Sequence, residues 1–223
     1  MTVASNTRLL FQGNSASVSG AGTFTINGGA TVGGTSSSAT VDFGGKTLTF
    51  PGTATLQVGD GSSPTTGTAL TFTNANIAMN SGSTLGFNLY GGSGGNGVAD
   101  LLVVGSGSSL TLNGVNLKLS YSGVLEEGVT YNLASYNSAF AAGAFTNVGL
   151  INPIPDYSGA DYNGYLQDQS SVFGINYNSG GYVTATVLMS AIPEPSTWAM
   201  LLTGAMMGGL GYWRKRRRAS APA

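Results

Sequence analysis

The sequence predicts an all-β chain whose body is a right-handed parallel β-helix with a β-hairpin cap, followed by one C-terminal transmembrane α-helix. Three observations support this prediction: short apolar runs, glycine pairs between them, and a late uncharged stretch that a basic cluster follows. The runs start about every 7–9 residues, so three of them would make a coil of roughly 20–25 residues. An antiparallel β-sandwich also uses short, evenly spaced strands and is the alternative fold.

Composition divides the chain into a repeating body over 1–135, a region over 136–190 that loses the repeat, and a tail over 191–223. In the body, apolar and small polar residues alternate, which indicates strands with one buried face. The glycine-rich run 90–97 interrupts this pattern and is interpreted as a break. Before it, strands are expected at Ala21–Ile26, Ala39–Phe43, Lys46–Phe50, Thr53–Val58, Ala69–Thr73 and Thr84–Tyr90.

Four further segments follow the break, at 99–105, 109–114, 115–121 and 126–133. This string resembles the closing coils of autotransporter-type β-helix passengers, with their D-x-L-x-V-x-G, L-x-L-x-G and G-x-x-Y-x-L phrases. The Asp100 strand departs slightly from the first phrase, because it reads Asp-Leu-Leu-Val-Val. The resemblance implies an architecture and no particular activity. Asp100 is interpreted as the residue that starts a strand and satisfies a turn.

The region that follows should close the solenoid. Residues 136–170 are expected to form an irregular loop, and 172–177 with 182–189 a hairpin around a Gly-Gly turn. A hairpin here would cover backbone groups that the open end leaves unpaired. Carboxylates in a loop are also candidate calcium ligands, although this spacing matches neither the EF-hand nor the nonapeptide pattern, and solvated loop acids are favoured. The candidates are Asp156, Asp161 and Asp168.

Composition excludes several classes of function. The chain has no cysteine and no histidine, which rules out disulfides, thiolate or imidazole metal sites and a Ser-His-Asp triad. No cofactor is predicted. Residues 1–193 hold three cations (Arg8, Lys46 and Lys118) against eight acids, a net charge of −5. The body therefore offers no basic surface for nucleic acid.

The tail has the features of a membrane anchor. No charge occurs from Ser196 to Trp213, and eighteen helical residues span roughly 27 Å, near the ~30 Å hydrocarbon core. The basic cluster 214–218 follows this stretch and is called the basic stop. It should stay in the cytoplasm, because short basic flanks resist translocation. A buried helix of a soluble domain is the alternative. The residues assigned to the span are Trp198, Leu201, Leu202, Gly204, Gly208, Leu210 and Trp213, and those of the basic stop are Arg214, Lys215, Arg216, Arg217 and Arg218.

A Pro-Glu-Pro motif, Pro193, Glu194 and Pro195, precedes the span. In this order the motif, the span and the basic stop resemble the PEP-CTERM sorting signal of Gram-negative bacteria. The resemblance implies that exosortase, an integral-membrane protease or transpeptidase, recognises the motif and cleaves near it. The chain would pass through the inner membrane and end at the cell surface or in the extracellular matrix, with exopolysaccharide or biofilm as its surroundings.

The expected function is that of a non-catalytic surface or matrix protein, with extracellular polysaccharide as a possible partner. The first twenty residues contain no apolar core of signal-peptide length, so an export signal is expected upstream of Met1. One alternative is a β-helix enzyme of the polysaccharide lyase type, which would need clustered acids and a basic residue beside the sugar. The other alternative is a surface adhesin.

Overall fold

The computed structural model describes residues 1–189 except 14, 36, 61–66, 94, 122–124, 137–139, 142–144, 149–161, 163, 169–170 and 180. Contacts divide the chain into two compact units, Met1–Ser190 and Ala191–Ala223. The described residues form strands, turns and bends, so the all-β prediction is confirmed for this part of the chain. No helix among them is long and apolar enough to span a bilayer. The predicted span at 196–213 lies outside the described residues.

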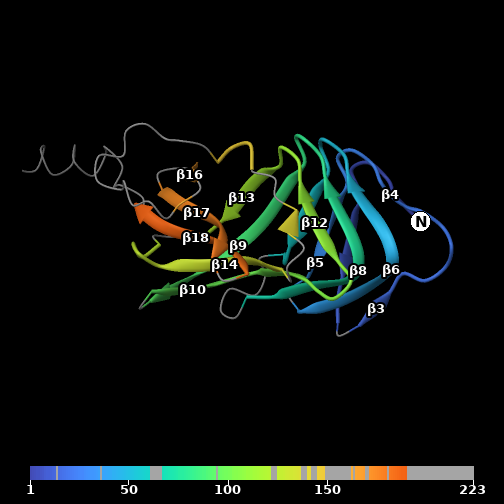
Figure 1. The fold of residues 1–223 in the computed structure, drawn as a ribbon, viewed down its shortest axis with the longest axis horizontal. Helices are drawn as coiled ribbons and strands as arrows, with labels where there is room; N and C mark the ends of the chain where they lie inside the picture. The colour runs from blue at the N-terminus through green and yellow to red at the C-terminus, as the bar shows by residue number, and fades with distance from the viewer. Residues whose placement is uncertain are drawn as a thin grey trace, which may run out of the picture. The chain divides into compact units, whose positions relative to one another are not determined.

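The body is a parallel β-helix with three faces (Figure 1). Face 1 consists of β1 (Thr2–Val3), β4 (Phe24–Ile26), the second halves of β6 (Ala39–Phe50) and β8 (Ala69–Met79), β12 (Ser109–Leu112) and β15 (Phe140–Ala141). Face 2 consists of β2 (Arg8–Phe11), β5 (Thr31–Gly34), β7 (Thr55–Val58), β9 (Thr84–Ser93) and β13 (Asn116–Ser120). Face 3 consists of β3 (Ala16–Ser17), the first halves of β6 and β8, β11 (Leu101–Val104) and β14 (Thr130–Tyr136). Every pairing within the three faces is parallel, so the antiparallel sandwich is wrong.

The later coils are longer than the first two. On face 1 the successive register partners Thr2, Thr25, Thr49, Ala78, Thr111 and Ala141 are 23, 24, 29, 33 and 30 residues apart. The expected coil of roughly 20–25 residues is therefore right for the first two coils and wrong for the later ones. In the fourth coil, from Ala78 to Thr111, the extra residues form an antiparallel strand pair, Thr84–Ser93 with Asn96–Ala99.

At the corner between faces 3 and 1, strands that were predicted to be separate are continuous. Ala39–Phe43 and Lys46–Phe50 are one bent strand, β6, in which Gly44 and Gly45 take φ of 58° and 81°. In β8 the corner is Asn74, with φ of 50°, and the strand continues to Met79. A left-handed residue turns the chain here without ending the strand, because asparagine tolerates this conformation better than most residues.

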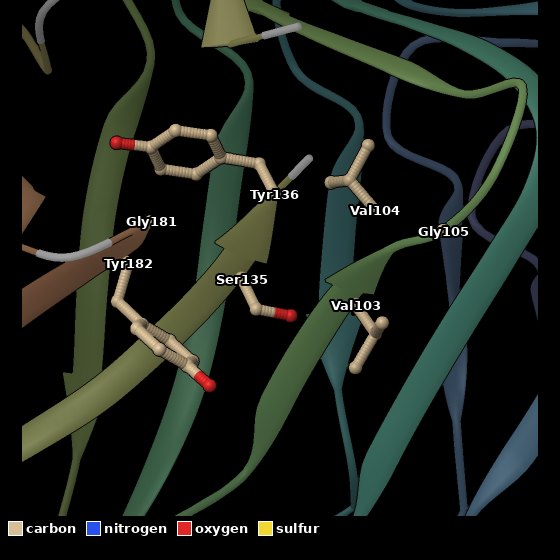
Figure 2. A pocket seen from close by; sticks show the side chains of 7 residues that line it. All are labelled: Val103, Val104, Gly105, Ser135, Tyr136, Gly181 and Tyr182. Atoms are coloured by element: carbon tan, nitrogen blue, oxygen red, sulfur yellow. The ribbon is translucent and has the colours of Figure 1, made fainter. Parts of the chain in front are cut away.

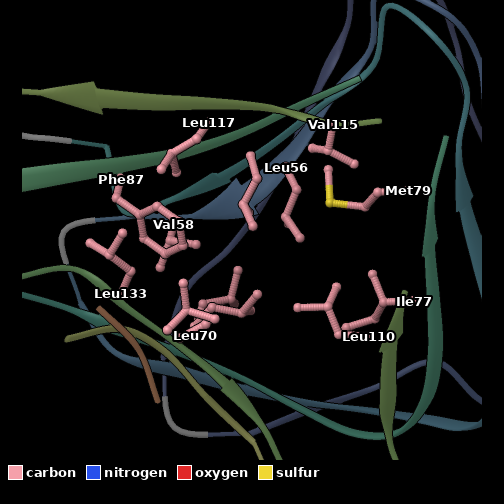
Figure 3. Packing of buried hydrophobic residues seen from close by; sticks show 14 of the residues in the cluster. Leu56, Val58, Leu70, Ile77, Met79, Phe87, Leu110, Val115, Leu117 and Leu133 are labelled. Atoms are coloured by element: carbon pink, nitrogen blue, oxygen red, sulfur yellow. The ribbon is translucent and has the colours of Figure 1, made fainter. Parts of the chain in front are cut away.

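The core consists of inward-facing columns, one residue from each coil. Face 2 supplies Val32, Leu56, Leu85 and Leu117, each at most 2% exposed, and Figure 3 shows Leu56 and Leu117 directed into the core that Leu70, Ile77 and Leu110 also line. Rings fill the early coils: the Phe43 centroid lies 5.4 Å from that of Phe24 and 5.2 Å from that of Phe72, nearly perpendicular to both. Such edge-to-face contacts add to the stability that burial provides.

The glycine-rich run is not a break, because β9 extends through it to Ser93. The chain then turns and returns as β10 (Asn96–Ala99), antiparallel to β9, with Asn96 opposite Ser93. Gly95 in the turn has φ of 96°, a conformation that favours glycine. The glycines therefore form the end of a hairpin that projects from the fourth coil.

An antiparallel cap closes face 3 at the C-terminal end of the body. The predicted hairpin is confirmed as β17 (Ser171–Ser179) and β18 (Tyr182–Met189), and β18 also pairs antiparallel with β14. A third strand, β16 (Gly164–Asp168), pairs with β17. The expected irregular loop over 136–170 is therefore wrong where it includes β15 and β16. The cap satisfies the backbone groups that the edge of β14 would otherwise leave unpaired.

Candidate functional site

The predicted site residues fall mostly outside the described part of the chain. This holds for the Pro193–Pro195 motif, the span, the basic stop, Asp156 and Asp161. Asp168 ends β16. Among the described residues no three potential metal ligands lie close enough together to hold an ion.

The three cations of the body lie on different parts of the solenoid. Arg8 is on β2 and Lys118 on β13, the first and last strands of face 2. Four strand spacings separate them, about 19 Å. Lys46 is at the corner between faces 3 and 1, where its Nζ donates to the carbonyl oxygen of Gly20 at 2.6 Å. The structure does not bring these three cations together into one site.

Asp100 is a fully buried acid at the base of the β9–β10 hairpin, with 0% of its surface exposed. Its Oδ1 accepts hydrogen bonds from the Thr68 backbone nitrogen and the Thr68 hydroxyl, both at 2.9 Å. Its Oδ2 accepts from Asn88 Nδ2 at 2.6 Å, and the Tyr90 hydroxyl lies 3.0 and 3.1 Å from the two oxygens. As predicted, Asp100 directly precedes a strand, but its partners come from an earlier coil and from the hairpin.

The surroundings of Asp100 indicate an anchor and not a catalytic acid. Burial, and after it the nearby charge of Asp100, raises the pKa of Tyr90 far above its ordinary value of 10, so its hydroxyl remains a donor. Gly59 has φ of 76°, and a Cβ there would collide with the Asp100 carboxylate. The protein's own donors thus satisfy the hydrogen-bonding capacity of the carboxylate, and its side chain leaves no room for a Cβ at Gly59.

Asp42 holds the corner between faces 3 and 1. Its Oδ1 accepts from the Gly44 nitrogen at 2.8 Å and from Asn74 Nδ2 at 3.0 Å. The bond from Gly44, and then that from Asn74, lowers the pKa of Asp42 below its ordinary value of 3.8.

This lowered pKa predicts a pH-dependent loss of stability. A carboxyl whose pKa is lower in the folded state stabilises the protein above the unfolded pKa, and the contribution disappears as pH falls through the folded pKa. We expect the free energy of unfolding to fall below about pH 4, and the Asp42→Asn variant to show a smaller fall. Urea titrations between pH 5 and pH 2.5 would measure this. Equal pH dependence in both proteins would contradict the assignment.

An open pocket of about 310 Å³ lies where face 3 meets the cap. Strands β11, β14 and β18 and the residues directly next to them line it with Val103, Gly105, Ser135, Tyr136, Gly181 and Tyr182, among others (Figure 2). Among the residues that the structure describes, none that lines the pocket is charged. The sequence analysis missed this site, because its residues are far apart in the chain and only the strand register brings them together.

Comparison with known proteins identifies the C-terminal part of the chain. Residues 190–218 match the model of the IPTL-CTERM motif, which belongs to the exosortase-type class of C-terminal signals. The tail is a C-terminal sorting signal. Such a signal is consistent with a protein of the cell surface or the extracellular space. No curated protein and no solved structure matches the chain.

The sorting signal corresponds to the residues singled out from the sequence. The match begins just before Pro193 and ends at Arg218, so it includes the motif, the uncharged stretch and the basic stop. The motif's name spells Ile-Pro-Thr-Leu, whereas this chain has Ile192 and Pro193 followed by Glu194 and Pro195. The class of signal predicted from the resemblance is therefore supported, and the β-helix predicted for the body is confirmed.

Proposed function

We propose that this chain is a non-catalytic cell-surface or extracellular-matrix protein that exosortase releases from the inner membrane at Pro193–Pro195. The observation behind this proposal is the sorting-signal match over 190–218. The last strand of the cap, β18, ends at Met189, so the match begins directly after it. The proteolytic site would thus follow a finished domain. Association with exopolysaccharide or biofilm is part of the proposal.

Each part of the sorting signal has a physical role in this scheme. Proline fixes φ and lacks a donor, so Pro193 and Pro195 keep the segment extended and unable to pair in a sheet. An extended strand is accessible to a protease. The uncharged stretch 196–213 would cross the bilayer, with Trp198 and Trp213 at its interfaces. The basic stop 214–218 would hold the end of the chain in the cytoplasm.

A non-catalytic role is supported by the positions of four of the described acids. Asp42 and Asp100 are both occupied by donors of the protein. Glu126 and Glu127 are adjacent and exposed, in a turn that precedes β14. A lyase-type site needs several acids and a cation around one sugar, and Arg8 and Lys118 are distant from each other along face 2.

Mass spectrometry of the exported protein would test the proposal. In a host with exosortase we expect the mature chain to end near Pro193–Pro195 and to be found at the surface. In the same host without exosortase, the intact chain should stay with the inner membrane. An intact tail on the surface protein of the exosortase-positive host would refute the scheme.

A further inference from the structure

One row of side chains crosses the outer surface of face 3 from β6 to the cap. Each member is the register partner of the next. Val103 points outward, because residues alternate along a strand and the neighbouring Val104 is only 3% exposed. Ser135 is the register partner of Val103 and lines the same pocket. In order, the row contains Thr40, Thr71, Val103, Ser135 and Tyr182, all of them half-buried.

The end of this row at Tyr182 is the open pocket. Figure 2 shows the Ser135 hydroxyl between the Tyr182 ring and Val103. The Tyr136 hydroxyl donates to the carbonyl oxygen of Tyr177 at 2.7 Å, which fixes that ring at the edge of the site. Within the described residues, the hydroxyls of Ser135 and Tyr182 have no hydrogen-bond partner. The pocket thus offers two tyrosine rings, of which that of Tyr136 is held in place, and two unused hydroxyls.

These groups match the chemistry of a sugar ring. A pyranose has an apolar face of C–H groups, which packs on an aromatic ring, and hydroxyls around its rim, which pair with groups that both donate and accept. A volume of about 310 Å³ is at the small end for ligand pockets, so it suits one ring with the rest of a polymer outside. The hydroxyls of Thr40 and Thr71 continue along the row and could contact the next units.

The charge of the site selects among ligands. The described part of the lining has no cation to pair with a carboxylate or a phosphate, so a uronic acid or a nucleotide would lose solvation without compensation. The net charge of −5 over residues 1–193 also repels polyanions. A neutral hexose polymer avoids both costs.

We infer that the pocket between Val103, Ser135 and Tyr182 binds a single ring of a neutral polysaccharide. This inference rests on the proposed function, because it names the class of partner that a delivered surface protein would hold. Stacking on Tyr182 would supply most of the affinity, and Ser135 would orient the ring.

Affinity electrophoresis of the full chain would test the site, with soluble neutral glucans and galactans in the gel and alginate as the acidic counterpart. We expect retardation by at least one neutral polymer and none by alginate. Tyr182→Ala should weaken the affinity about tenfold through loss of stacking, and Ser135→Ala about fivefold through loss of one hydrogen bond. Tyr182→Phe keeps the ring and the packing, so it should weaken binding less than Tyr182→Ala.

Thr49→Ala provides the control, because Thr49 is an exposed hydroxyl on face 1 and its loss should leave the affinity unchanged. Should Tyr182→Ala fail to fold, Ser135→Ala and Tyr182→Phe still decide the question, since both must weaken binding. Retardation by none of the neutral polymers would overturn the inference, as would equal effects of the Ser135 and Thr49 substitutions. A chain that reaches the surface and binds no glycan refutes only the pocket, whereas a glycan-binding chain with an uncut tail refutes only the sorting.

Discussion

Replacing Asp100 by alanine is expected to lower the free energy of unfolding by about 3–4 kcal/mol, because it leaves the buried donors of Thr68 and the partly buried donors of Asn88 and Tyr90 without this acceptor. Asp100 is 0% exposed, so water cannot easily replace its carboxylate. The loss should concentrate where the β9–β10 hairpin joins the solenoid. The acid connects two coils there, through Thr68 on one side and the hairpin on the other.

Urea unfolding followed by circular dichroism would measure the loss, and hydrogen exchange would locate it in 88–104. Glu126→Ala is the matched control, since it removes an exposed carboxylate and should change stability by less than about 0.5 kcal/mol. Asp100→Asn should destabilise the fold as well, because an amide presents one donor group to a cluster of donors. A cost for Asp100→Ala as small as that of the control would show that the cluster is not an anchor.

Neutralising the basic stop is expected to abolish normal sorting. Replacing Arg214, Lys215, Arg216, Arg217 and Arg218 by glutamine removes an attraction of about 1 kcal/mol per residue to anionic cytoplasmic lipids, about 5 kcal/mol in all. Without it the end of the chain is no longer held on the cytoplasmic side. The Pro193–Pro195 motif would then leave the depth at which a membrane protease can cut it.

Cell fractionation with a tag near the N-terminus would show the outcome. The neutral variant should lose most of its trimmed surface form, whereas replacing all four arginines by lysine keeps every charge and should preserve it. Trimming of the neutral variant at the normal level would contradict the role of the basic stop. Because the body is unchanged in both variants, a folding defect would not explain a difference between them.

The strands were the most predictable part of this fold. Alternation over Ala39–Phe43 and Thr84–Tyr90 predicted which side chains are buried, and the structure agrees. Strand ends were less predictable, since Gly44–Gly45 bends β6 without ending it and the glycines after Tyr90 form a hairpin turn. Glycine permits both a break and a tight turn, so its presence alone does not distinguish them.

The candidate site on the body could not be predicted in the same way. Val103, Ser135 and Tyr182 belong to three strands, two of them parallel neighbours and the third an antiparallel strand of the cap. All four residues of β11 are apolar, and the alternation in β14 is interrupted between Asn132 and Ala134, so the period of two does not show from the sequence that Val103 and Ser135 face outward. Nor does it tell which residue of another strand lies beside them. For Asp100 the sequence predicted that a strand starts there. Its hydrogen-bond partners became visible only in the packing of the coils.

The sequence by itself determined the classes of chemistry that are excluded, the all-β body and the sorting signal, because composition, alternation and the order of the tail's parts are local properties of the chain. The tertiary structure decided the length of each coil, the addition of a three-stranded cap to β14, and the neighbours of Asp100 and Tyr182. These depend on contacts between coils 23 to 33 residues apart. Such contacts are set by how the inward columns pack together, and no short stretch of sequence contains that information.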